Sequence, residues 1–183
     1  IIDGYFNQVP AVWHKEILWA MAQGVVIGGA ASMGALRAAE LDRWGMKGYG
    51  KIYQAYKNAV LPPFNNESFE DDDEVAIIHG PAELGYLAIS EAMVNIRFTL
   101  AKASRHGIID APTCTQLTRL SKKLFYAERN YTSLLNIARQ QGISNSLIDN
   151  LADWIARHAV DQKRVDAIEL LKSGYKTQIS RIA

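Results

Sequence analysis

The stretch VVIGGAASMGALR, residues 25–37, decides the expected fold. Its apolar start, residues 25–30, is typical of a buried strand in a parallel sheet. Two glycines end that run, and from Ser32 the residues are typical of a helix that closes at Gly45. Further strand patterns lie at residues 1–6 and 74–80, and helical patterns at 11–24 and 50–61. This alternation predicts an α/β fold with a small parallel sheet and flanking helices in the N-terminal half.

The second half of the chain carries helical patterns alone. They cover residues 87–107, 111–130, 131–142, 146–160 and 161–174. We therefore expect an α/β catalytic core over residues 1–85 and an all-helical portion over residues 86–183, packed on that core.

Composition excludes several classes of protein. The 183 residues include 20 basic and 19 acidic side chains, and this balance argues against a nucleic-acid binder. No apolar run approaches the ~20 residues of a membrane helix, and no signal peptide is visible. The single cysteine, Cys114, fits a reducing cytoplasm. The four histidines are scattered without metal-ligand spacing, so we expect no metal and no cofactor. The opening IIDGYF lacks a Met, which predicts a further upstream segment.

Polar residues follow each of the three predicted strands. Asp3 lies at the exit of the first strand, Ser32 after the second and His79 at the exit of the third. In an open parallel sheet, ligands bind outside the carboxyl ends of the strands. His14 and Lys15 lie about one turn into the helix that follows the first strand, so we expect all five residues at one edge.

Ser32 has three possible roles at this edge. Small residues stand two positions before and after it, at Ala30 and Gly34, as in the G-x-S-x-G turn that exposes a nucleophilic serine. The amide of Met33 would then serve as an oxyanion donor at a helix N-terminus. Alternatively, Ser32 caps the helix, or the glycine-rich turn binds a phosphate.

A nucleophilic serine needs a base, and two candidates stay open. Lys15 must be neutral to act, while His79 has a suitable intrinsic pKa. Asp3, His14 and Arg37 are expected to contact the substrate or a partner, although Arg37 and Glu40 stand three residues apart and favour a structural ion pair. The acidic run 70–74 is typical of a solvated loop or of a docking patch for a basic partner.

Four blocks together resemble the TfuA-like family: VWHKEILWA at 12–20, GAASMGALRAAEL at 29–41, DDDEVAIIHGPAELGY at 71–86 and SEAMVNIR at 90–97. The likeness covers about residues 1–100, and the helical remainder carries no assignable motif. The short segment AASMGA also resembles the nucleophile segment of Clp-type serine peptidases, which we interpret as a similar turn.

The resemblance implies a partner and a reaction. TfuA-like proteins act beside YcaO enzymes, which activate peptide backbone amides with ATP during thioamidation of ribosomally made peptides. The TfuA partner is thought to hydrolyse a thiocarboxylated sulfur carrier of the ThiS type and so to release sulfide. The family site is described as a Ser–Lys pair. By motif the serine is Ser32 and the lysine is Lys15, although Lys47 and Lys51 also lie within reach in the sequence.

The resulting hypothesis is a serine hydrolase with Ser32 as nucleophile, Lys15 as base and His79 orienting or donating a proton. Backbone groups at Met33, Gly29 and Gly34 would line the oxyanion site. The main alternative is a non-catalytic adaptor that docks on the YcaO enzyme and activates it. A nucleotide-binding domain is disfavoured because no acidic ribose ligand follows a second strand.

Overall fold

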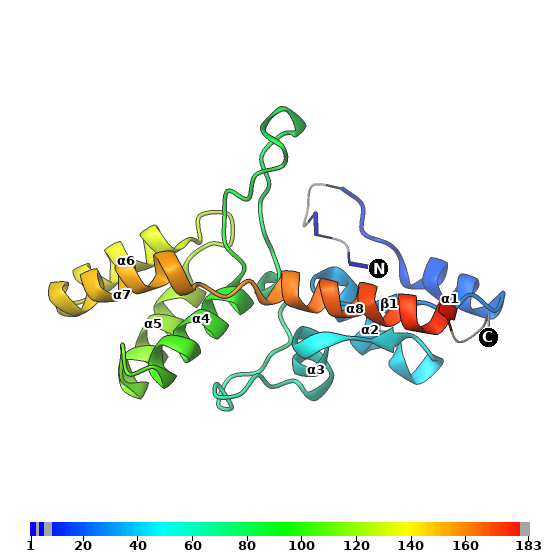
Figure 1. The fold of residues 1–183 in the computed structure, drawn as a ribbon, viewed down its shortest axis with the longest axis horizontal. Coiled ribbons are helices and arrows are strands. Elements are labelled where there is room, and N and C mark those ends of the chain that lie inside the picture. The colour runs from blue at the N-terminus through cyan, green and yellow to red at the C-terminus, as the bar shows by residue number, and fades with distance from the viewer. Residues whose placement is uncertain (3, 6–8, 180–183) are drawn as a thin grey trace. The chain divides into compact units, whose positions relative to one another are not determined.

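A computed structural model describes residues 1–2, 4–5 and 9–179, with only the helical backbone for 174–179 (Figure 1). Asp3 therefore lies outside the described residues. The chain forms two compact units. Unit 1 comprises Ile1–Val75 and Gln162–Ala183, and unit 2 is the intervening Ala76–Asp161. The C-terminal helix thus belongs to the same unit as the N-terminal residues, a division that differs from the expected boundary at residue 85.

Unit 1 is the mixed α/β part of the molecule. Two short strands run parallel, with Gly28 opposite Lys47 and Gly29 opposite Gly48. The predicted parallel sheet with flanking helices is therefore confirmed, although the sheet is small. Along the chain the elements are α1 (His14–Ala22), β1 (Gly28–Gly29), α2 (Met33–Leu41), η1 (Asp42–Trp44), β2 (Lys47–Gly48), α3 (Gly50–Asn58), η2 (Asp72–Glu74) and α8 (Gln162–Ile179).

Residues 1 and 2 extend the hydrogen bonding on the other edge of β1. The Ile1 nitrogen donates to the Gly28 carbonyl at 2.6 Å, and the Ala30 amide donates to the Ile1 carbonyl at 3.1 Å. The two bonds lie on either side of Gly29, which is the hydrogen-bond pattern of a neighbouring parallel strand. The Gly34 amide then donates to the Ile2 carbonyl at 3.1 Å. The start of the chain is thereby fixed against both β1 and the first turn of α2.

The third strand predicted at residues 74–80 is wrong. Helix η2 ends at Glu74, and the bridge that the described residues form after it is antiparallel, from His79 to Ala88. A short apolar run is compatible with any buried segment, and Val75 and Ala76 are indeed fully buried in irregular structure. The second strand of the sheet is instead β2, which was not predicted because Lys47–Gly48 has no apolar pattern.

Helix α1 is shorter than predicted at its start. It begins at His14 rather than near Pro10, and its first turn is closed by a bond from the Trp13 amide to the Glu16 carboxylate at 2.9 Å. Its end is as predicted, because Gly24 has φ +83° and its amide donates to the Met21 carbonyl. This left-handed glycine ends α1 and sends the chain back towards β1.

Helix α8 is held in unit 1 by buried polar side chains. The Asp166 carboxylate accepts from the Ile52 amide at 2.8 Å, in the first turn of α3, and from the Gln162 amide group at 2.6 Å. Lys163 donates to the Val75 carbonyl. Asp166 therefore caps α3 from a distant part of the sequence, where Tyr49, at the N-cap position, makes no side-chain bond.

Unit 2 contains helices and no assigned strand among its described residues. The C-terminal helical portion is thus confirmed for this segment, although its first helix starts at Met93 instead of residue 87. Asp110 and Asn130 cap the second and third of its α-helices through bonds to the amides of Thr113 and Ser133, both at 2.8 Å. The helices are η3 (Ala82–Leu84), α4 (Met93–Arg105), α5 (Ala111–Lys123), α6 (Tyr131–Gln140) and α7 (Asn145–His158).

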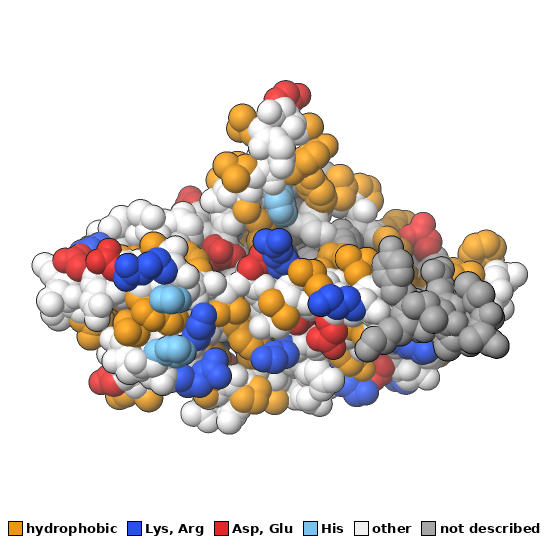
Figure 2. Space-filling view, viewed as in Figure 1, with side chains coloured by type: hydrophobic (Ala, Val, Ile, Leu, Met, Phe, Trp, Pro, Cys, Tyr) orange, Lys and Arg blue, Asp and Glu red, His pale blue; other side chains and the backbone are white. Residues whose placement is uncertain are grey.

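A hairpin over residues 79–89 stands out from the helices of unit 2 (Figure 1). Large apolar side chains on it are exposed, namely Leu84, Tyr86, Leu87 and Ile89. Figure 2 shows hydrophobic side chains along this hairpin. Among the described residues, no helix combines the length and low polarity that crossing a bilayer requires.

Candidate functional site

Ser32 lies between the end of β1 and the start of α2. It occupies the N-cap position, but its side chain makes no capping hydrogen bond. The residue is only 1% exposed, and its Oγ has no hydrogen-bond partner among the described residues. A buried hydroxyl without a partner carries a desolvation cost of about 1–3 kcal/mol, so such groups are rare and call for an explanation. The capping role is therefore not what this hydroxyl performs.

The backbone before Ser32 makes a sharp, strained turn. Ala31 has φ +70°, and the Ser32 amide donates back to the Ala30 carbonyl at 2.8 Å. This i to i+2 bond around a positive-φ residue defines a rare kind of γ-turn. A non-glycine residue in such a conformation costs about 1–3 kcal/mol, and strained residues of this kind cluster at functional sites. The tight bend predicted from the small residues is present.

Two glycines allow the elements around Ser32 to approach closely. A Cβ on Gly29 would overlap the Gly34 carbonyl, and a Cβ on Gly34 would overlap the Ile1 carbonyl. Because these obstacles are backbone atoms, they cannot move aside as a flexible side chain would. The glycines of this stretch thus bring residue 1, β1 and α2 into backbone contact.

The three predicted oxyanion groups differ in their surroundings. The Gly34 amide donates to the Ile2 carbonyl, and Gly29 is paired in the β1–β2 ladder. Met33 is the first residue of α2, where an amide has no acceptor within its own helix. Met33 therefore remains the best of the three predicted donors.

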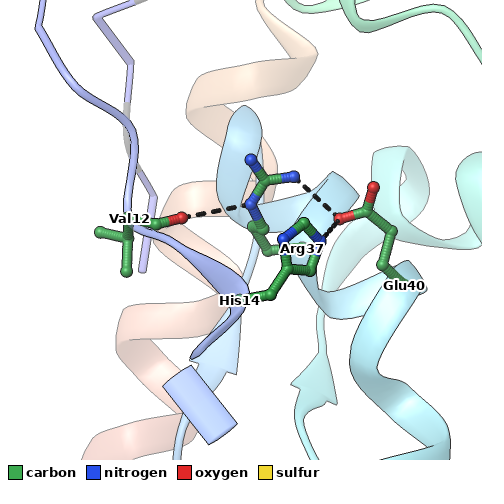
Figure 3. A network of polar contacts seen from close by, with 4 residues as sticks. All are labelled: Val12, His14, Arg37 and Glu40. Carbon is green, nitrogen blue, oxygen red and sulfur yellow. Dashed lines mark hydrogen bonds and ion pairs between the residues drawn. The ribbon is translucent and has the colours of Figure 1, made fainter. Parts of the chain in front are cut away.

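A polar network joins α1 to α2 (Figure 3). Arg37 donates from Nε to the Val12 carbonyl at 3.3 Å and from Nη1 to Glu40 Oε2 at 2.8 Å. His14 Nε2 lies 2.7 Å from the same Glu40 oxygen. The predicted Arg37–Glu40 ion pair is confirmed. His14 and Arg37 both contact one carboxylate of their own chain, and their predicted contact with substrate stays a prediction.

This network places the start of α1 at the far end of α2 from Ser32. Glu40 is eight residues beyond Ser32, which corresponds to about 12 Å along a helix axis at 1.5 Å per residue. Lys15 follows His14 and is exposed. The contacts described around the start of α1 thus join Val12 and His14 to the later half of α2. For this reason the predicted pairing of Lys15 with Ser32 gains no support from the described contacts.

A different lysine lies at the carboxyl edge of the sheet. Because Gly29 is opposite Gly48, Ser32 and Lys51 each stand three residues beyond the last ladder pair. Lys51 is exposed and lies in the first turn of α3. From the sequence, Lys51 is recognisable only as lying near Ser32 along the chain, because β2 has no strand pattern of its own. The alternating glycines in KGYG, residues 47–50, were the available signal.

Asp166, on α8, is the acidic residue next to the first turn of α3. Burial raises the pKa of the Asp166 carboxyl, while backbone bonds from Ile52 and Lys51 and the charge of Lys51 act in the opposite direction. A carboxylate at the N-terminus of α3 is favoured by the helix dipole. Lys51 and Asp166 thus form a charged pair of groups at the end of β2.

The remaining predicted site residue, His79, belongs to unit 2. His79 was expected at the edge of the sheet because it ended a predicted strand. Residues 74–80 do not form that strand, so this reason for placing His79 there is lost. Its catalytic role stays a prediction. No group of three His, Cys, Asp or Glu side chains suited to a metal ion occurs in the part of the chain that the structure describes.

The sequence of the chain matches a known family. The family described as TfuA-like protein matches residues 3–130, which is more than half of the chain. The chain therefore belongs to the TfuA-like family. No curated protein matches it.

Proposed function

We propose that this TfuA-like protein is a serine hydrolase that releases sulfide from the C-terminal thiocarboxylate of a ThiS-type carrier for a YcaO enzyme. The observation that carries the proposal is the buried Ser32 hydroxyl, which has no partner among the described residues and follows a strained turn. Strain and an unsatisfied hydroxyl both lower stability, so their coincidence at one residue favours a functional role. Membership of the TfuA-like family supports the choice of substrate class and partner.

The reaction is an acyl transfer. Ser32 Oγ forms a bond to the thiocarboxylate carbon while a base accepts its proton. The Met33 amide stabilises the negative charge on the oxygen, and the helix dipole of α2 adds to this. The carbon–sulfur bond breaks and sulfide leaves. Water then attacks the Ser32 ester, which restores the hydroxyl and yields the carrier carboxylate, so the sum is one thiocarboxylate and one water to one carboxylate and one sulfide.

The test is sulfide release from a purified thiocarboxylated carrier. We expect Ser32→Ala to lower the turnover number by at least ~10³-fold while the variant stays folded, because the nucleophile is lost. Thr115→Ala, which removes an exposed hydroxyl bonded to the Ala111 carbonyl in α5, is the matched control and should retain turnover. Undiminished release by Ser32→Ala would refute the hydrolase.

A second candidate is the non-catalytic adaptor that docks on a YcaO enzyme. The observation that favours it is the burial of Ser32, since an inaccessible hydroxyl does not attack a protein C-terminus unless the site opens. The adaptor predicts that Ser32→Ala supports thioamidation equally with carrier-bound sulfur and with free sulfide. The hydrolase predicts loss with carrier-bound sulfur and rescue by sulfide.

A further inference from the structure

Helix α8 has its polar and apolar side chains on the reverse of the usual sides. Three polar residues of the helix are buried in unit 1, namely Gln162, Lys163 and Asp166. Three large apolar residues are exposed, namely Val165 at 53%, Ile168 at 40% and Leu171 at 56%. A surface helix of a globular protein normally turns its apolar side to the core and its charged side to water. The reversed arrangement of α8 therefore calls for an explanation.

The three exposed apolar residues form one row along the helix. Val165, Ile168 and Leu171 follow one another at intervals of three residues, and side chains at this spacing are neighbours on a helix surface. Helix α8 lies on the side of unit 1 that faces the viewer in Figure 1. Single exposed apolar side chains are common, whereas a contiguous group of them marks a surface that contacts another molecule. We call Val165, Ile168 and Leu171 the α8 row.

The inner side of α8 fixes the row in position. The Asp166 carboxylate accepts from the Ile52 amide of α3, and Lys163 donates to the Val75 carbonyl. Both bonds hold the helix from the side opposite the row. A surface that is already ordered loses little conformational entropy when it binds, which favours association.

Charged residues beside the row indicate what it contacts. Arg164 and Glu169 are both exposed, and they stand next to Val165 and Ile168 along the chain. Consider two α8 helices packed antiparallel about a two-fold axis that passes between residues 166 and 167. Val165 then faces Ile168 of the partner subunit, because the two positions are equally far from the axis.

The same axis pairs the charges. Arg164 and Glu169 are also equally far from it, so Arg164 lies beside Glu169 of the partner subunit, and the symmetry repeats this pair. Opposite charges beside an apolar row select the partner and the orientation of paired helices. Charges of one sign would instead indicate a partner of the opposite sign. The row and its flanking charges are therefore complementary to themselves.

We infer that α8 is the interface of a homodimer, in which the α8 row packs antiparallel against the α8 row of a second copy of this chain. The inference is independent of the proposed hydrolase function, since it concerns the side of α8 that faces away from α3. The paired segment is short, so we expect a dissociation constant in roughly the micromolar range.

The experiment is sedimentation velocity of the whole chain over a concentration series from roughly 1 μM to 1 mM. Wild type should change from monomer to dimer within this range. Ile168→Glu should raise the dissociation constant by at least ~10-fold, because the symmetry places the buried charge in the interface twice. Leu87→Glu is the matched control, since it changes an exposed apolar residue of unit 2, and it should stay within about twofold of wild type.

A charge exchange tests the register and does not depend on the apolar variant. Arg164→Glu and Glu169→Arg should each raise the dissociation constant by about fivefold, because each brings like charges together in both symmetric pairs. The double variant restores opposite charges and should return to within about twofold of wild type. The urea unfolding midpoint of each variant, measured at a concentration where wild type is monomeric, should equal that of wild type.

Three results would overturn the inference. A chain that stays monomeric up to about 1 mM would leave the α8 row to a different protein. A dimer that Ile168→Glu does not weaken would have its interface elsewhere. A double variant that dimerises no better than the single charge variants would contradict the antiparallel register.

Discussion

The strained turn at Ala31 makes a prediction that stability measurements can test without any substrate. Replacing Ala31 with glycine removes a conformational cost of about 1–3 kcal/mol, because glycine adopts φ +70° freely. The change also deletes a buried methyl group, which is worth about 0.8 kcal/mol, and adds about 0.7 kcal/mol of backbone entropy to the unfolded chain. With a strain of ~2 kcal/mol, Ala31→Gly should be slightly stabilising, by roughly 0.5 kcal/mol.

The preceding residue provides the matched control. Ala30 is fully buried and has no positive φ. Ala30→Gly loses the same methyl and the same entropy without relieving strain, so it should destabilise unit 1 by about 1.5 kcal/mol. Urea unfolding of both variants should therefore differ by about 2 kcal/mol in the free energy of unfolding. Equal destabilisation by the two substitutions would show that no strain is stored before Ser32.

Three further predictions concern other parts of the chain. Gly29→Ala should lower the free energy of unfolding by about 3 kcal/mol or prevent folding, because its Cβ would overlap the Gly34 carbonyl. Urea unfolding measures this loss, and a loss below ~1 kcal/mol would contradict the close contact. Because burial raises the folded-state pKa of Asp166, the contribution of this carboxyl to stability is present below about pH 4 and is lost as the pH rises through that pKa. Asp166→Asn should therefore gain stability relative to wild type as the pH is raised above about 4 in urea unfolding, and a constant difference would refute this. Burial likewise raises the pKa of the Cys114 thiol, so a disulfide reagent should modify it only after denaturant is added, and rapid modification of the native protein would be contrary to its burial.

The features that the sequence predicted well are those with a local cause. The glycine at the end of α1, the α2 pattern and the small residues around Ser32 each have a conformational reason within a few positions. The resemblance to TfuA-like proteins rested on contiguous blocks and was likewise recoverable from the sequence.

The features that the sequence missed depend on contacts between distant residues. The strand Lys47–Gly48 has no strand pattern of its own and exists because it pairs with β1. The buried run that begins at Val75 has the apolar pattern of a strand, yet it is not assigned as a strand because it pairs with no neighbouring strand among the described residues. Asp166 caps a helix more than a hundred residues away, which no local signal reveals.

The missing strand also bears on the predicted base. His79 was expected at the edge of the sheet because of a strand that residues 74–80 do not form, and the described contacts of Val12 and His14 do not bring Lys15 towards Ser32. The catalytic roles of both residues stay predictions.

The most direct measurement of the central claim is the intact mass of the protein after rapid mixing with a thiocarboxylated carrier and quenching in acid. We expect a transient adduct that contains the carrier acyl group, maps to Ser32 and is absent in Ser32→Ala. Sulfide release in full amount with no adduct on Ser32, or with an adduct on another residue, would contradict it.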